Sequence, residues 1–208
     1  MSGFKFAVLI SGNGSNLGSI IDHINKDKIE GCICCVLSNN PEALGLERAK
    51  EEGIPCEIVD HKQFAKRSDF DTRMVEKLDK YKPDLIVLAG FMRILSYAFI
   101  QAYEGKILNI HPSLLPKYPG LNTHQRVLES GDSLHGISIH FVDESLDGGP
   151  ICAQSKIKVS NSNAYQLKER IHVLEHELYP KIIDLFAKGR LYLNEGKAYL
   201  DGKEIKLK

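Results

Sequence analysis

The chain has 208 residues, of which 43% are apolar and 26% charged, and its 27 basic residues balance its 27 acidic ones. This composition is typical of a compact globular protein and excludes a disordered chain, and no apolar run reaches the ~18 residues that a membrane span needs. Because the chain has no net charge to attract nucleic acid, we do not expect it to bind nucleic acid through a basic face. Its five cysteines are an odd number and cannot all pair, so we expect reduced thiols in a cytoplasmic protein.

Short β-branched apolar runs alternate with longer amphipathic segments along the first half of the chain. The runs predict strands at 6–10, 32–37, 56–59, 84–89 and 107–110. The segments between them predict helices at 16–25, 42–52, 69–81 and 96–103. Strand and helix alternating in this way indicate an α/β, Rossmann-like fold, with a mostly parallel twisted sheet flanked by helices.

The pattern changes after Gly120. Segments 136–142 and 150–159 alternate in character and predict an antiparallel extension at one edge of the sheet. A long helix is predicted over 164–188, and the tail to residue 202 predicts a short hairpin. Because no linker divides the chain, we predict one domain, 1–208, with a phosphate-binding parallel half at 1–112 and a second half at 113–208.

A glycine-rich turn, 12–16, follows the first predicted strand. Glycines let the backbone approach a ligand, and the helix that begins there offers unpaired amides to an anion. A dinucleotide is disfavoured, because Leu17 replaces the third glycine of the fingerprint and the neutral segment 38–40 stands where an acidic residue is expected. The neutral side chains of the turn suit a monophosphate, and a plain tight turn into a helix is the alternative.

Two polar residues, Asn109 and His111, occupy the end of a buried strand and share one face of it. Ligands of parallel sheets bind at that end, and three prolines stiffen the loop that follows. Asp147, followed by two glycines, is expected to bring a carboxylate to the imidazole and to favour its charged form. Imidazolium and amide would then stabilise an oxyanion, which suits acyl transfer without a metal. A buried Asn and His that only satisfy loop backbone are the alternative.

Four motifs, at 10–17, 88–95, 108–121 and 146–150, resemble the folate-dependent phosphoribosylglycinamide formyltransferase family, over essentially the whole chain. The resemblance implies transfer of a formyl group from 10-formyltetrahydrofolate, the co-substrate, to the amine of 5-phosphoribosylglycinamide (GAR). The product would be formyl-GAR of de novo purine biosynthesis. Both partners are small molecules. The resemblance implies no metal, nucleic acid or membrane, and a homodimer is compatible with it.

The resemblance also implies roles for single residues. The catalytic group would be Asn109, His111 and Asp147. GAR would be bound by Gly14, Ser15 and Asn16, and by Glu175 in the long helix. Folate would be bound by Arg67, Met92, Arg93, Ile94, Leu95, Asn109, Asp143 and Asp147. The half at 113–208 would supply the folate loop around Asp143 and Asp147, together with the C-terminal helix. By pattern alone, Met92, Ile94 and Leu95 would be core residues. Gly18 and Asn122 depart from the family's pattern outside the catalytic group.

Four other functions compete with this interpretation. Formyltetrahydrofolate hydrolase and methionyl-tRNA formyltransferase share the core, but each normally carries an additional domain, for which we expect no room here. The spacing of His172, Glu175 and His176 matches a zinc motif that lacks an identifiable further ligand. A non-catalytic phosphosugar-binding protein would keep the turn at 12–16 without needing the catalytic group.

Overall fold

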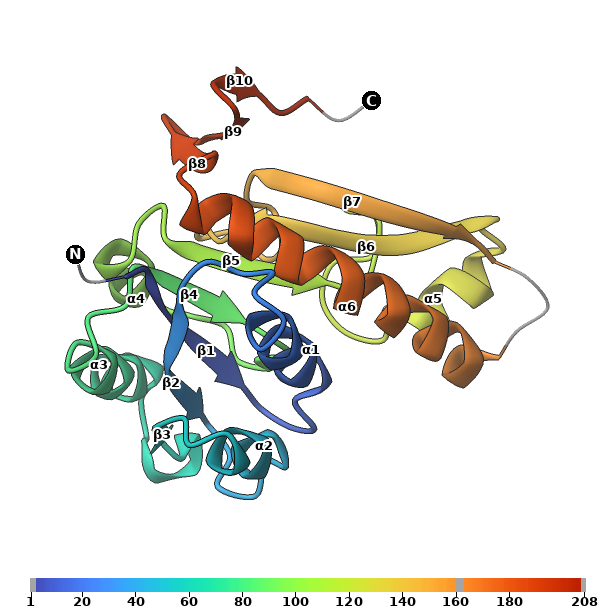
Figure 1. The fold of residues 1–208 in the computed structure, drawn as a ribbon. Helices are drawn as coiled ribbons and strands as arrows, with labels where there is room; N and C mark the ends of the chain where they lie inside the picture. The colour runs from blue at the N-terminus through green and yellow to red at the C-terminus, as the bar shows by residue number, and fades with distance from the viewer. Residues whose placement is uncertain (1–2, 160–162, 207–208) are drawn as a thin grey trace. The chain divides into compact units, whose positions relative to one another are not determined.

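A computed structural model describes residues 3–159 and 163–206 (Figure 1). The chain divides into two compact units, Met1–Leu108 and Asn109–Lys208, called here the N-terminal and the C-terminal unit. The first contains β1 Lys5–Ile10, α1 Ser15–Ile24, β2 Cys32–Ser38, α2 Gly45–Glu51, β3 Cys56–Ile58, the 3-10 turn η1 His61–Gln63, α3 Arg67–Leu78, β4 Leu85–Leu88 and α4 Tyr97–Ala102. Strand β5, Ile107–His111, carries the chain across the division. The second contains α5 Thr123–Ser130, β6 Leu134–Phe141, β7 Ile151–Lys158, α6 Ala164–Ala187, β8 Leu191–Asn194, β9 Lys197–Leu200 and β10 Lys203–Glu204.

Parallel strands build the sheet of the N-terminal unit. Strand β1 pairs with β2 on one side and with β4 on the other, and β2 pairs with β3, all in parallel. Strands β1 and β4 are apolar and almost completely buried, which is typical of parallel strands covered on both faces. The order along the seven-stranded sheet is β3-β2-β1-β4-β5-β6-β7. The predicted Rossmann-like, mostly parallel fold is confirmed.

In the C-terminal unit, β6 and β7 form an antiparallel pair, which confirms the predicted edge extension. Helix α6 contacts both strands and begins with a capping box between Asn163 and Gln166. Its buried face includes residues at intervals of four, as an amphipathic helix requires: Leu167, Ile171, Glu175, Tyr179 and Ile183. The acidic residue in this otherwise apolar stripe, Glu175, is the one to which the resemblance gives a role in GAR binding.

Several details differ from the predicted elements, among them the unpredicted 3-10 turn η1 and the end of α3 at Leu78 rather than at 81. Helix α5 was not predicted, because it has eight residues and buries only two of them, too few to show a period. Helix α2 begins at Gly45 rather than at 42, since the Asn40 side chain accepts the Glu42 amide at 3.1 Å and holds a turn there. The tail adds a third strand, β10, to the predicted hairpin. Over the ranges that the structure describes, no helix is both long and apolar enough to cross a membrane.

Candidate active site

Three side chains predicted to act together converge within the C-terminal unit. Asn109 and His111 lie two residues apart on β5, and the loop after β6 carries Asp147. The Nδ1 atom of His111 lies 3.4 Å from Oδ2 of Asp147. The Asn109 amide lies beside them and contacts His140, whose Nε2 is 3.1 Å from Asn109 Nδ2 and 3.9 Å from Asp147 Oδ1. Their convergence is observed, and their catalytic role remains a prediction.

Both ring nitrogens of His111 face oxygen acceptors. Its Nε2 donates to the Tyr118 carbonyl at 2.9 Å, while Nδ1 faces the Asp147 carboxylate. A carbonyl and a carboxylate can only accept, so a doubly protonated ring satisfies both neighbours. The His111 side chain is buried, which keeps this arrangement away from bulk water. The geometry suits an imidazolium fixed in one orientation.

The loop 112–122, which supplies the Tyr118 carbonyl, is anchored to the strands behind it. Ser138, fully buried on β6, accepts the Leu115 amide at 3.0 Å and donates to the Ser113 carbonyl at 2.7 Å. From β7, the Gln154 side chain donates to the Leu115 carbonyl at 2.8 Å. Buried polar groups that are fully paired make a segment rigid. The rim of the site is therefore held by hydrogen bonds as well as by prolines.

The loop before β7 holds Asp147 in an unusual backbone conformation. Asp147 has φ +52°, a left-handed conformation that aspartate tolerates better than most residues. Its Oδ2 also accepts the Gly120 amide at 2.8 Å, which ties the two loops of the site together. Gly149 cannot be replaced, because a Cβ there would stand 2.0 Å from the Phe141 carbonyl oxygen. Asp143, by contrast, is exposed and accepts the Ser145 amide at 2.9 Å.

In the N-terminal unit, the glycine-rich turn opens α1. Gly14 is the N-cap at φ +71°, and a Cβ on it would lie 2.7 Å from the Cα of Gly45. A glycine N-cap has no side chain to cap the helix, and no side-chain hydrogen bond caps α1, which is the kind of helix start that an anion seat requires. Arg48 of α2 donates from Nε to the Asn13 carbonyl at 3.2 Å and adds a positive charge beside the turn. The position of Gly14–Asn16 fits the predicted phosphate seat.

The predicted folate segment after β4 is mostly exposed. Met92 and Ile94 expose 63% and 60% of their surface, against the core positions that pattern alone favoured, whereas Leu95 is buried. The Met92 amide donates to Ser11 Oγ at 2.7 Å, which fastens this segment to the end of β1. Arg67 and Arg93 are exposed. The segment thus offers an apolar surface with charged neighbours.

Glu175 is 5% exposed on α6, and it lies in the segment whose spacing matches a zinc motif. Its Oε2 lies 4.0 Å from Nε2 of His172, and the rings of His172 and His176 stack at 5.9 Å between centroids. Burial lowers the pKa of His172 below its ordinary value. Within 3–159 and 163–206, no group of three or more His, Cys, Asp or Glu side chains is arranged to hold a metal ion.

Comparison with known proteins decides the family. Residues 4–183 match the model of the formyl transferase family. The chain belongs to the formyl transferase family. The matched range contains every residue assigned above to catalysis or to substrate binding, and it confirms the resemblance seen in the motifs.

Relatives of this formyl transferase have closely similar sequences and folds. The phosphoribosylglycinamide formyltransferase of Escherichia coli (strain K12) is 49% identical over 202 residues, 97% of this chain and 95% of that protein. The trifunctional purine biosynthetic protein adenosine-3 of Bos taurus is 41% identical over 92% of this chain, which spans 19% of that longer protein. The solved phosphoribosylglycinamide formyltransferase of Coxiella burnetii is 46% identical and superposes with a TM-score of 0.94 over 98% of this chain and 96% of that one.

Two residues of this formyl transferase to which sequence analysis assigned no role contact its predicted site residues. His140 is hydrogen-bonded to Asn109 and lies 3.9 Å from Asp147, and Ser11 joins the turn at the end of β1 to Met92. A signal for His140 was present: Ser138 and His140 stand two apart on an apolar strand, as Asn109 and His111 do. Ser11 offered no comparable signal, because a serine beside a glycine-rich turn is common.

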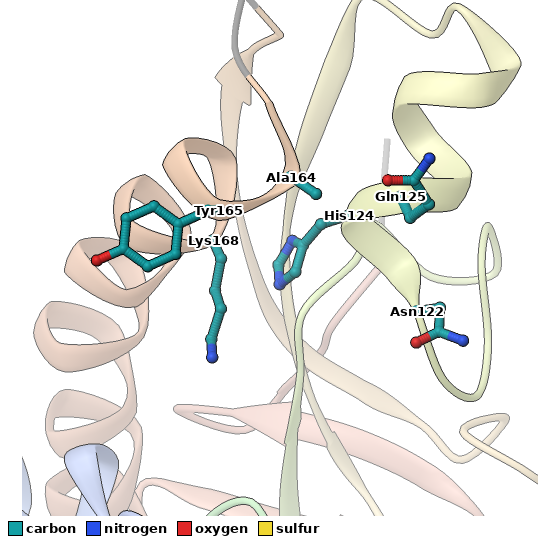
Figure 2. A pocket seen from close by; sticks show the side chains of 6 residues that line it. All are labelled: Asn122, His124, Gln125, Ala164, Tyr165 and Lys168. Atoms are coloured by element: carbon teal, nitrogen blue, oxygen red, sulfur yellow. The ribbon is translucent and has the colours of Figure 1, made fainter.

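A hollow of about 230 Å³ lies between α5 and the start of α6, and no residue of the catalytic group lines it (Figure 2). Its lining residues are Asn122, His124, Gln125, Ala164, Tyr165 and Lys168. Behind it, His124 Nδ1 is 3.0 Å from Nε2 of His135, which is buried on β6. Burial lowers the pKa of both imidazoles to about 4. The two rings are therefore neutral at neutral pH and share one hydrogen bond.

Proposed function

We propose that this chain transfers the formyl group of 10-formyltetrahydrofolate to the amine of GAR, a step of purine biosynthesis. The observation that carries the proposal is the convergence of Asn109, His111 and Asp147 in a member of the formyl transferase family. Relatives similar over nearly the whole chain are named for formyl transfer to this acceptor. Both substrates are small molecules.

In the proposed reaction the amine nitrogen of GAR attacks the formyl carbon and forms a new C–N bond. The formyl oxygen becomes an oxyanion, the bond from that carbon to N10 of the folate breaks, and the proton lost by the amine ends on N10. Asn109 donates an N–H to the oxyanion, and His111 as imidazolium supplies positive charge beside it. If the oxyanion accepts directly from His111 Nε2, it must replace the Tyr118 carbonyl. Asp147 holds the imidazolium in place.

The binding residues divide by chemistry. The phosphate of GAR is assigned to the amides of 14–16 at the start of α1, where the helix dipole favours an anion. Glu175 is assigned to the glycinamide or ribose portion, whose hydroxyl and amine groups can donate to a buried carboxylate. Holding two substrates in a reactive orientation supplies much of the rate, so no nucleophilic side chain is required.

The folate is assigned to the segment 92–95, with Arg67, Asp143 and the catalytic residues Asn109 and Asp147. The exposed Met92 and Ile94 offer the apolar surface that a flat ring needs. The Met92 amide is already used by Ser11, so the ring edge would be recognised by other backbone groups of the segment.

An absorbance assay that follows conversion of 10-formyltetrahydrofolate to tetrahydrofolate, with and without GAR, tests the proposal. We expect turnover that depends on GAR, and a fall of about 10²–10³-fold in kcat for His111→Ala. His23→Ala is the matched control, because this histidine lies on α1 and bonds the Ser19 carbonyl of its own helix. Turnover that ignores GAR would indicate a hydrolase. Absence of turnover in the wild type would contradict the proposed function.

A further inference from the structure

His140 has one hydrogen-bonding neighbour at each ring nitrogen. It lies near the end of β6 and is 2% exposed. Its Nδ1 is 2.8 Å from the carbonyl oxygen of Phe141, and its Nε2 is 3.1 Å from Nδ2 of Asn109. The Asp147 carboxylate is farther away, at 3.9 Å from Nε2. The ring therefore stands between a backbone acceptor and the amide that is assigned to oxyanion binding.

These contacts determine which nitrogen of His140 carries the proton. A carbonyl oxygen can only accept, so Nδ1 must donate. Burial lowers the pKa of His140 below its ordinary value, although the Phe141 carbonyl and the charges of Asp147 and Asp143 oppose this and His111 supports it. The ring is then neutral, and a neutral imidazole with its proton on Nδ1 presents a lone pair at Nε2. That lone pair requires a donor from Asn109.

We propose that His140 is a positioning residue that locks the Asn109 amide in one orientation, with one N–H held by His140 and the other available to the oxyanion. An amide can rotate by half a turn and exchange its oxygen for its NH₂ group, which would turn an acceptor towards the developing negative charge. A fixed acceptor at Nε2 prevents this exchange. Among the residues that the structure describes, the Asn109 side chain has no hydrogen-bond partner other than His140. The inference rests on the proposed function, because it explains how the oxyanion donor is oriented.

A double-mutant cycle tests the coupling between the two residues. His140→Phe removes the acceptor, and we expect kcat to fall about tenfold while KM for GAR changes by less than about twofold. In an Asn109→Ala background the same substitution should change kcat by less than about twofold, because no amide remains to be oriented. An equal, tenfold loss in both backgrounds would overturn the proposal. His135→Phe is the matched control, since it removes another buried histidine of β6 that does not touch Asn109, and its effect should be the same in both backgrounds.

Rescue separates orientation from a structural role. His140→Gln replaces Nε2 by a side-chain carbonyl that can accept the same N–H, and we expect it to keep kcat within about threefold of the wild type. If His140→Gln loses as much activity as His140→Phe while thermal unfolding is unchanged, acceptor geometry is not what matters and the inference fails.

A spectroscopic measurement on the wild type does not depend on any variant being active. In protein with ¹⁵N-labelled histidine, the His140 signal, assigned by its loss in His140→Gln, should show a neutral ring protonated at Nδ1 throughout neutral pH. An Nε2-protonated or charged ring overturns the inference.

Failure of the proposed function and failure of this inference give different results. A wild type without GAR-dependent turnover would contradict the proposed function, and this spectrum would still decide the His140–Asn109 hydrogen bond. GAR-dependent turnover with an additive cycle would contradict only the positioning role.

Discussion

Acid should destabilise this protein in part through His135, a neutral imidazole buried against His124. Burial lowers the pKa of His135 to about 4, from an ordinary value of 6.5, and the side chain is only 1% exposed. Between these two values the unfolded chain binds a proton that the folded chain does not. The free energy of unfolding therefore begins to fall as the pH drops through the unfolded pKa, and the loss is complete below the folded one.

The size of the effect follows from the difference between the two pKa values. A shift from 6.5 to about 4 corresponds to about 3.5 kcal/mol at ~1.4 kcal/mol per unit. About 2.5 kcal/mol of this should be lost between about pH 7 and about pH 4.5. We count His135 alone, because His124 is partly exposed and solvent screens its charge. A typical domain has a stability of about 5–15 kcal/mol, so this loss is large enough to measure.

His135→Gln isolates the contribution. Glutamine keeps a polar atom near the position of Nε2, facing His124, but does not titrate. Urea unfolding followed by circular dichroism at several pH values gives the free energy of unfolding of both proteins. We expect the wild type to lose about 2.5 kcal/mol more than the variant over this pH range. Equal losses in the two proteins would refute the reasoning, because His135 would then take up its proton alike in the folded and unfolded chain.

Three further changes test the backbone and the charges of the site. Gly14→Ala should lower the free energy of unfolding by about 2–3 kcal/mol in urea titrations, because the new Cβ meets Gly45. Gly53→Ala is the control: Gly53 also has a left-handed φ but faces open space, so this change should lower the free energy of unfolding by about 1 kcal/mol. Asp147→Asn should reduce kcat about 10²-fold in the absorbance assay. The unfolding temperature should be nearly unchanged, since the new side-chain oxygen can still accept the Gly120 amide. A normal kcat would show that the carboxylate has no role in the mechanism. Arg48→Ala should raise KM for GAR several-fold with little effect on kcat, which steady-state kinetics would show, and a changed kcat with constant KM would argue against a role in phosphate binding.

Much of the fold followed from local patterns. Short β-branched runs predicted the parallel strands of the N-terminal unit nearly to the residue, because strands buried on both faces read as continuous apolar segments. Helix α5 was not predicted, because Thr123–Ser130 is short and mostly polar and therefore shows no helical period. The residues that bound it, Asn122 and Gly131, both have left-handed conformations. The localisation and the homodimer stay predictions.

The sequence by itself determined which chemistry the site can hold. An amide and an imidazole two apart at a strand end, a carboxylate before two glycines, and a glycine turn at a helix start are local features, and family membership supports them. Only the tertiary structure decided how these groups are connected. His140 reaches Asn109 across 31 residues, and the Tyr118 carbonyl takes the His111 Nε2 proton. Such contacts depend on strand register and loop conformation, which arise from packing the whole unit and not from the spacing of any one segment.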